Sequence, residues 1–360
     1  MMLLQCGCCP KVPAGFFDAR SRKSSTNAVR AAAKPAAKAK RRASPPARRI
    51  DVHHHIAPPA YRTLKAASSL EPPNAHRDAL YEGWNPGVAL ESMDEGGTAT
   101  AITSITDGTF IALHPQRARI AREVNEFAAR MRQNHPGRFG HFATLPMPDV
   151  DASLAELEYA LDVLKMDGVD IRTSYGMQWL GDSAFAPIYE ELNRRKAIVY
   201  SHPHEPPFAQ KLIPGVPGST IEFCTDSTRA IASVLFGGVT LRFPDVRFIF
   251  SHAGGTLPFL VGRFTNLAGR PQHTGRFPRG VMAEIRKLHY ELAQATHPGA
   301  LDALLRIVPV KQILFGTDFP HFNAKDTARE IGRYGFSPKD LAAIDRGNAL
   351  RLFPRFAKTL

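Results

Sequence analysis

Short apolar segments alternate with amphipathic segments along most of the chain. The segments at 98–105 (TATAITSI) and 246–251 (VRFIFS) are rich in β-branched and large apolar residues, as is typical of strands buried on both faces of a sheet. Between such segments the apolar residues recur at helical spacing, and over 117–134 they fall on a single stripe. The pattern predicts a parallel sheet whose strands are connected by helices.

Eight strands can be placed in this way. They span residues 50–52, 100–105, 139–145, 169–173, 198–201, 248–251, 288–292 and 313–316. The predicted helices span 61–67, 88–95, 117–134, 150–165, 185–195, 228–236, a segment from 282, 298–307 and segments after 326. Eight such units over about 310 residues match the size of a (β/α)8 TIM barrel. A doubly wound open sheet is the alternative, but it normally has a glycine-rich phosphate turn after its first strand, where this chain has histidines. We therefore expect an α/β protein with a (β/α)8 barrel over residues 49–360.

Charge separates the first 48 residues from this predicted barrel. Residues 1–49 hold twelve of the 46 Lys and Arg residues and one of the 33 acidic residues, so the remainder is nearly neutral. The segment 1–48 is also rich in Ala, Ser and Pro, which predicts a disordered basic tail. Its composition resembles an organellar transit peptide, but it lacks the apolar core of a secretory signal. We expect a cytoplasmic protein, with an organellar location through a cleaved segment as the alternative.

Composition makes several other classes of protein unfavourable. Because the basic charge belongs to the tail, we expect no nucleic-acid partner. Mean hydropathy is −0.21, and no apolar run is long enough to cross a bilayer, so no membrane partner is expected either. The four cysteines, Cys6, Cys8, Cys9 and Cys224, do not form a disulfide framework.

Polar side chains stand at the ends of four predicted strands. Side chains alternate along a strand, so His53 and His55 face the same way and His54 faces the other. His202 and His252 end the fifth and sixth strands, and Asp318 follows the eighth. In a barrel the carboxyl ends of all strands face one mouth, where active sites lie. The sequence therefore brings four histidines and an aspartate to one opening.

These residues predict a catalytic metal site. His53, His55, His202 and Asp318 offer three nitrogens and a carboxylate, with room left for water or substrate. Such a set suits one divalent ion, Zn²⁺ first and Mn²⁺ as the alternative. The fourth strand has no lysine that could bridge a second ion. His252 remains available as a general acid or base.

The roles of other polar residues are left open by the residues alone. Arg172 is predicted to bind a substrate carboxylate or to form a salt bridge at the barrel mouth. His204 is predicted to contact substrate or to support its loop, and Glu291 to orient a ligand histidine. Asp226 has the position of a helix N-cap. Most of the histidines without a strand-end position are expected to be solvated: His76, His114, His135, His141, His273, His289 and His297.

Four motifs resemble those of a known family. They are DVHHH at 51–55, VYSHP at 199–203, FIFSHAGG at 248–255 and LFGTDFP at 314–320. They resemble the metal-dependent decarboxylase branch of the amidohydrolase superfamily, which includes aminocarboxymuconate semialdehyde, γ-resorcylate and 6-methylsalicylate decarboxylases. The resemblance extends over roughly residues 49–355 and does not include the tail.

The resemblance implies a function and a set of site residues. It implies His53, His55, His202 and Asp318 as metal ligands, His252 as the catalytic histidine, and a homodimer. The expected reaction is non-oxidative decarboxylation of an aromatic or dienoic carboxylic acid, such as 6-methylsalicylate, with Asp318 or His252 as the proton donor. The same ligands also permit hydrolysis of an ester, lactone or amide. Arg172 and Glu291 stand where the family leads us to expect an apolar residue and Asp, which leaves the substrate open.

Overall fold

Eight parallel strands form the centre of the protein, described by a computed structural model that covers residues 48–70, 75–105, 108–210 and 212–358. All of the predicted tail except residue 48 lies outside the described residues, so its disorder and targeting role stay predictions. The strands are β1 (Arg49–Ile56), β2 (Thr98–Ile105), β3 (Phe139–Thr144), β4 (Gly168–Arg172), β7 (Ile198–His202), β8 (Arg247–Phe250), β9 (His289–Glu291) and β10 (Ile313–Leu314).

The sheet curves into a barrel that is nearly closed. Neighbouring strands follow one another in chain order, and every ladder between them is parallel. The first and last strands meet through backbone hydrogen bonds, since the Val52 N–H donates to the Phe315 carbonyl and the His55 N–H to the Phe319 carbonyl. The predicted (β/α)8 barrel is confirmed, with strand ends within a few residues of those expected.

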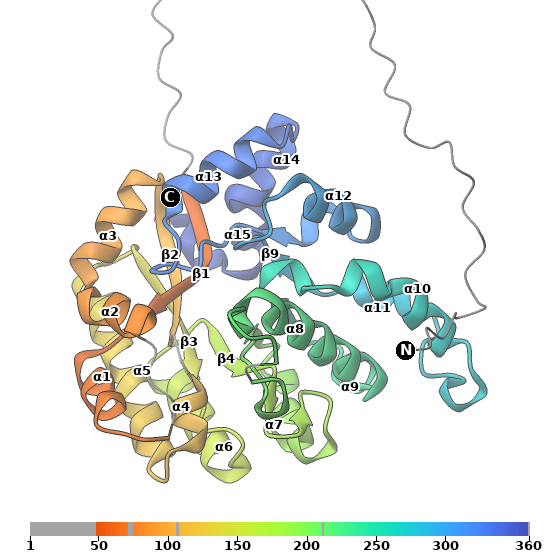
Figure 1. The fold of residues 1–360 in the computed structure, drawn as a ribbon, viewed down its shortest axis with the longest axis horizontal. Helices are drawn as coiled ribbons and strands as arrows, with labels where there is room; N and C mark the ends of the chain where they lie inside the picture. Colours follow the sequence, from red (N-terminus) through yellow and green to blue (C-terminus); the bar gives the residue numbers. More distant parts are fainter. Residues whose placement is uncertain (1–47, 71–74, 106–107, 211, 359–360) are drawn as a thin grey trace, which may run out of the picture. The chain divides into compact units, whose positions relative to one another are not determined.

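Helices surround the strands (Figure 1). They are α1 (Pro59–Ala66), α2 (Ala75–Gly83), α3 (Pro86–Glu95), α4 (Gly108–Leu113), α5 (Arg117–Asn134), α6 (Val150–Glu158), α7 (Ala186–Arg194), α8 (Gly218–Phe236), α9 (Val239–Arg242), α10 (Leu257–Ala268), α11 (Val281–Ile285), α12 (Pro298–Ile307), α13 (Ala324–Arg333), α14 (Pro338–Ala342) and α15 (Asn348–Leu352). A small hairpin of β5 (Ser174–Tyr175) and β6 (Gln178–Trp179) follows β4. Among the described helices, none has both the length and the apolar character that crossing a bilayer requires.

An apolar cluster fills the barrel at the amino ends of its strands. Side chains such as Ile50 and Ile198 meet Phe353 and Phe356, which come from the C-terminal segment and close this end. A larger apolar cluster lies between the strands and the surrounding helices. Because the amino end is packed with apolar side chains, the polar residues of the strands gather at the carboxyl end.

Several local predictions were wrong. Helix α8 begins at Gly218, ten residues before the predicted start, so Asp226 lies buried within the helix instead of capping it. Thr173 and Trp179 donate to its carboxylate, which offsets the cost of burying it. Helices α2, α4 and α10 were not predicted, and a π-helical turn at Tyr159–Val163 ends α6 early. His141, expected in solvent, is buried on β3.

Candidate active site

The end of β1 directs two of its three histidines into the barrel. His53 and His55 face the interior, as predicted, because side chains alternate along the strand. His54 faces the other way, where its ring stacks on Phe319 at 4.5 Å and its Nδ1 lies 3.0 Å from the Asp51 carboxylate. The triplet therefore supplies two side chains to the site and one to the packing around it.

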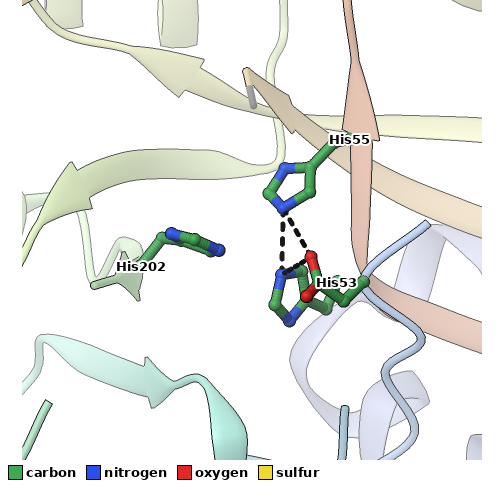
Figure 2. Close-up of side chains that lie close together, drawn as sticks. His53, His55 and His202 are labelled. Atoms are coloured by element: carbon green, nitrogen blue, oxygen red, sulfur yellow. Dashed lines mark hydrogen bonds and ion pairs between the residues drawn. The ribbon is translucent and has the colours of Figure 1, made fainter. Parts of the chain in front are cut away.

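The four predicted ligands converge on one point. Oδ1 of Asp318 lies 3.1 Å from Nε2 of His53 and 3.1 Å from Nε2 of His55. His202 completes the group, in which one ligand atom from each residue lies within 4.8 Å of the others. Figure 2 shows the three imidazoles turned toward one another. Strands that are far apart in the sequence thus meet as expected at the carboxyl end of the barrel.

The surroundings of each imidazole determine which nitrogen faces the centre. Nδ1 of His53 lies 2.8 Å from Glu291 Oε1, Nδ1 of His55 lies 3.1 Å from Ser104 Oγ, and Nδ1 of His202 lies 2.7 Å from the Pro203 carbonyl. If each Nδ1 carries the hydrogen, all three Nε2 lone pairs are left for an ion, an arrangement common around bound metals.

The donor atoms fit a divalent cation. Nε2 of His202 and Oδ1 of Asp318 are buried without a hydrogen-bond partner among the described residues. Unpaired buried polar atoms are costly, and a metal ion at the centre would satisfy both of them. Three imidazole nitrogens and one carboxylate oxygen form the donor set of a catalytic site that keeps a position open.

Electrostatics favour the same occupant. Burial lowers the pKa of His55 to about 3, and burial together with Arg172 lowers the pKa of His202 well below its usual value, so both are neutral ligands. Burial raises the pKa of Asp318, but His53 and the other histidines outweigh it and hold that pKa well below its usual range. Burial lowers the pKa of His53 too, yet Glu291 and Asp318 raise it to about 10, which marks a place that attracts positive charge.

Glu291 orients the site from behind His53, as predicted. Besides accepting from the His53 ring, its Oε1 accepts from the His252 backbone N–H at 2.7 Å, and its Oε2 accepts from the Ala293 N–H at 2.6 Å. Gly316 leaves room for this carboxylate, because a Cβ at that position would collide with Oε2. The buried Glu291 is therefore held by three partners, one on β1 and two in the segments that follow β8 and β9.

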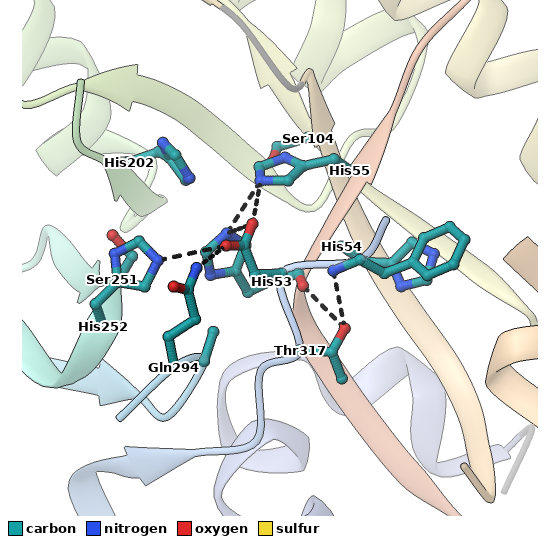
Figure 3. Close-up of polar contacts among 12 residues, drawn as sticks. His53, His54, His55, Ser104, His202, Ser251, His252, Gln294 and Thr317 are labelled. Atoms are coloured by element: carbon teal, nitrogen blue, oxygen red, sulfur yellow. Dashed lines mark hydrogen bonds and ion pairs between the residues drawn. The ribbon is translucent and has the colours of Figure 1, made fainter. Parts of the chain in front are cut away.

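His252 lies beside Asp318, and Figure 3 shows it across the site from His55. Its Nε2 is 3.7 Å from Asp318 Oδ2, and neither ring nitrogen has a hydrogen-bond partner among the described residues. The backbone is left-handed at both His252 and Ala253, with φ of 52° and 56°. Such strained conformations gather at functional sites. The structure brings His252 to the site, while its catalytic role stays a prediction.

The two predicted substrate-binding residues lie at the same mouth. Arg172 is the ladder neighbour of His202, and its guanidinium is buried, where it donates to the Ile105 carbonyl at 2.9 Å and pairs with Asp170 at 3.2 Å. The salt bridge is thus confirmed, and contact with substrate stays a prediction. His204 is half-buried, with Nε2 3.4 Å from Ser174 Oγ.

Three residues near the ligands were missed by the sequence analysis. Gln294 donates to Oδ2 of Asp318. The His321 ring lies 6.3 Å from that of His55 and 6.0 Å from that of Tyr81, which also lines a cavity of about 610 Å³ beside α1 and α2. Ser104, the third, holds His55. His321 and Ser104 could have been found from their positions after and within strands that end at the mouth. Nothing in the sequence distinguishes Gln294.

Comparisons with known proteins agree with this site. The family model described as amidohydrolase matches residues 50–355. Decarboxylase yanB of Aspergillus niger is 35% identical over 86% of this chain and 88% of that protein. The 6-methylsalicylic acid decarboxylase of Penicillium expansum is 34% identical over 85% and 96%.

A solved structure supports the fold independently. The dihydroxybenzoic acid decarboxylase of Polaromonas sp. JS666, with bound manganese and the inhibitor 2-nitroresorcinol, matches with a TM-score of 0.73 and 23% identity. The match covers 87% of this chain and 98% of that one. The family model and the relatives over 30% identical lead to one conclusion: the chain belongs to the amidohydrolase family, in the branch of its decarboxylases.

Proposed function

We propose that the protein is a metal-dependent decarboxylase of an aromatic carboxylic acid with an oxygen substituent beside the carboxylate, such as 6-methylsalicylate. The observation that carries the proposal is the buried centre of His53, His55, His202 and Asp318, with the imidazole of His252 next to it and without a hydrogen bond among the described residues. Two relatives that are 34% identical, and that are matched over 96% and 97% of their own length, are named 6-methylsalicylic acid decarboxylases.

The centre is proposed to hold one divalent ion through Nε2 of His53, His55 and His202 and through Oδ1 of Asp318. Zn²⁺ suits these donors, and Mn²⁺ is the alternative, supported by the manganese in related decarboxylase structures. When bound, the ion supplies a positive charge that orients the carboxylate and its neighbouring oxygen and stabilises charge developing on them.

His252 is proposed to donate the proton that drives the reaction. The proton forms a new C–H bond at the ring carbon that bears the carboxylate, so that this carbon becomes tetrahedral. The bond from this carbon to the carboxylate then breaks, its electron pair restores the aromatic ring, and CO₂ leaves. His252 regains a proton from solvent. Asp318, the other predicted donor, is less suited, because the neighbouring histidines hold its pKa well below its usual range and so keep it a carboxylate.

Arg172 and His204 are proposed to bind the parts of the substrate that do not contact the metal ion. Arg172 adds a buried positive charge next to His202, which favours an anionic substrate. His204 is half-buried at the adjacent loop and can offer a hydrogen bond to a ring substituent. The Asp170 partner of Arg172 limits how far the guanidinium can turn.

Product analysis tests the proposed reaction. Purified protein is loaded with Zn²⁺ or Mn²⁺ and incubated with a panel of hydroxybenzoates and a panel of lactones. We expect CO₂ and the corresponding phenol from at least one 2-hydroxybenzoate, and no activity after chelation. Release of ring-opened acid without CO₂ would identify a hydrolase instead, which is the alternative that the same ligands permit.

The enzyme is also proposed to be a cytoplasmic homodimer. Large apolar side chains are exposed on α10 and on the loop before α8, with Phe259 84% and Leu212 61% exposed. Such side chains favour association between protein surfaces. Light scattering on the protein as it elutes from a size-exclusion column should give twice the mass of the chain.

The cytoplasmic location is tested with fluorescent fusions of the protein with and without residues 1–48. Both fusions should stay in the cytoplasm, whereas organelle staining that requires residues 1–48 would support a targeting role.

A further inference from the structure

Gln294 stands at the barrel mouth between solvent and the buried Asp318. It follows β9 by three residues, and its side chain is exposed, whereas that of Asp318 is only 6% exposed. Figure 3 shows the Gln294 amide extending toward the centre of the site. Its Nε2 donates to Oδ2 of Asp318. The contact joins the turn after β9 to the turn after β10.

The two oxygens of Asp318 consequently have different surroundings. Oδ1 faces Nε2 of His53 and His55, while Oδ2 receives the Gln294 amide. His252 Nε2 lies 3.7 Å from Oδ2, which is beyond hydrogen-bond distance. At this distance the two groups form an ion pair when His252 is protonated, but a hydrogen bond between them would require the carboxylate to rotate. The Gln294 hydrogen bond to the same oxygen opposes such a rotation.

The backbone at Gln294 is unusual for a residue of its type. Its φ is 54°, in the left-handed region, which is strained for residues other than glycine. Glutamine has no particular preference for this conformation, unlike Asn or Gly. The conformation directs the long side chain of Gln294 toward Asp318, and in the same turn the Ala293 N–H donates to Oε2 of Glu291.

We infer that Gln294 is a positioning residue whose amide holds Oδ2 of Asp318, so that Oδ1 faces the metal site and His252 forms no hydrogen bond with Oδ2. An amide is suited to this role because it donates a hydrogen bond without adding charge. A lysine or arginine there would neutralise the carboxylate that the ion needs. This role rests on the proposed metal-dependent function.

Two substitutions separate positioning from a merely structural role. Gln294→Met keeps the length of the side chain and removes the donor. Gln294→Gly also removes the donor but relieves the left-handed backbone, so its thermal stability should equal or exceed that of the wild type. Gln272→Met, at an exposed position away from the site, is the matched control.

The measurements are the dissociation constant of Mn²⁺, by calorimetry, and a crystal structure of the Zn²⁺-loaded Met variant. We expect both Gln294 variants to bind Mn²⁺ about 10–100-fold more weakly than wild type, as is usual when a partner of a metal ligand is removed. The Gly variant should do so without loss of stability. In the crystal structure, His252 Nε2 should lie within 3.2 Å of Asp318 Oδ2.

Unchanged Mn²⁺ affinity in both variants, or an unchanged Asp318 orientation, would overturn the role of Gln294 and leave the proposed function intact. A wild-type protein that binds neither Mn²⁺ nor Zn²⁺ would overturn the metal centre itself and this role with it. The two failures are distinguishable because neither measurement depends on knowing the substrate.

Discussion

Each ligand imidazole of this site owes its orientation to a single oxygen atom. Glu291, Ser104 and the Pro203 carbonyl each lie within 3.1 Å of one Nδ1, and together they turn three Nε2 atoms toward Asp318. The residues proposed to bind the ion are therefore distinct from the residues that orient them. Substitutions at this site should therefore fall into two classes. One class abolishes binding of the ion, and the other leaves the ion bound.

His252 belongs to the second class. His252→Asn should leave Mn²⁺ binding within about threefold of wild type, because the four proposed ligands do not include it. Decarboxylation should fall by about 10²–10⁴, the usual contribution of a general acid. Metal content by mass spectrometry and CO₂ release measure the two effects. Activity close to that of the wild type would show that another group delivers the proton.

His141 predicts a pH dependence of stability. Burial, with a smaller effect of Arg132, lowers its pKa to about 3, whereas in the unfolded chain the pKa is near 6.5. Below pH 6.5 the unfolded chain therefore binds a proton that the folded protein does not. The free energy of unfolding should fall as pH falls from 6.5 toward 3, by up to about 1.4 kcal/mol per pH unit from this group.

Replacing the residue isolates this contribution. Between pH 6.5 and pH 4.5 the free energy of unfolding of the wild type should decrease. In His141→Met this decrease should be smaller by about 2–3 kcal/mol. Urea unfolding at the two pH values gives the difference. Identical losses in the two proteins would show that His141 is protonated in the folded state.

At the scale of elements, the junction of β1 and β10 carries most of the site. The Asp318 N–H donates to the His53 carbonyl at 2.8 Å, and Asp51 accepts from both the Thr317 and His53 backbone N–H groups. The hydrogen bonds that close the barrel between β1 and β10 therefore also bring the proposed ligands of these two strands together. A change that separates these strands should disturb the metal site before it disturbs the rest of the barrel.

Gly316→Ala tests this coupling. Its Cβ would collide with Glu291 Oε2 and lie 3.0 Å from the His53 Cβ. We expect a loss of about 1–3 kcal/mol in the free energy of unfolding, together with weaker Mn²⁺ binding. Gly332→Ala, in α13 with open space around the new Cβ, is the control and should be neutral or stabilising by up to about 1 kcal/mol. Equal stabilities and equal Mn²⁺ affinities in the two variants would contradict the coupling.

At the scale of the whole molecule, the basic tail and the barrel are predicted to act separately. The first strand begins at Arg49, whose guanidinium pairs with Asp345 at 2.9 Å and donates to the Gly96 carbonyl at 2.7 Å, so β1 has its own anchor. Removing residues 1–47 should leave decarboxylation within about twofold of the full chain. It should also weaken retention on a polyanion such as heparin, because the tail holds most of the excess positive charge. Loss of folding on truncation would show that the tail is part of the barrel.

The sequence by itself determined the barrel, the strand order and the four positions proposed as metal ligands. Alternation along β1 directs His53 and His55 to one side, and parallel strands bring His202, His252 and Asp318 to the same mouth. These inferences hold because they depend only on local geometry repeated eight times. The same logic could not place Asp226, since an aspartate within a helix resembles a cap until its buried partners are known.

Only the tertiary structure decided how the side chains of the site are oriented and which partners they have. It determined which nitrogen of each imidazole faces the centre, that Gln294 holds Asp318, that His321 lies near His55, and that His141 is buried. Each of these depends on contacts between segments far apart in the chain or on left-handed turns after the strands. Neither can be inferred from local periodicity, because periodicity places a side chain on a face and does not identify the atom that it meets there.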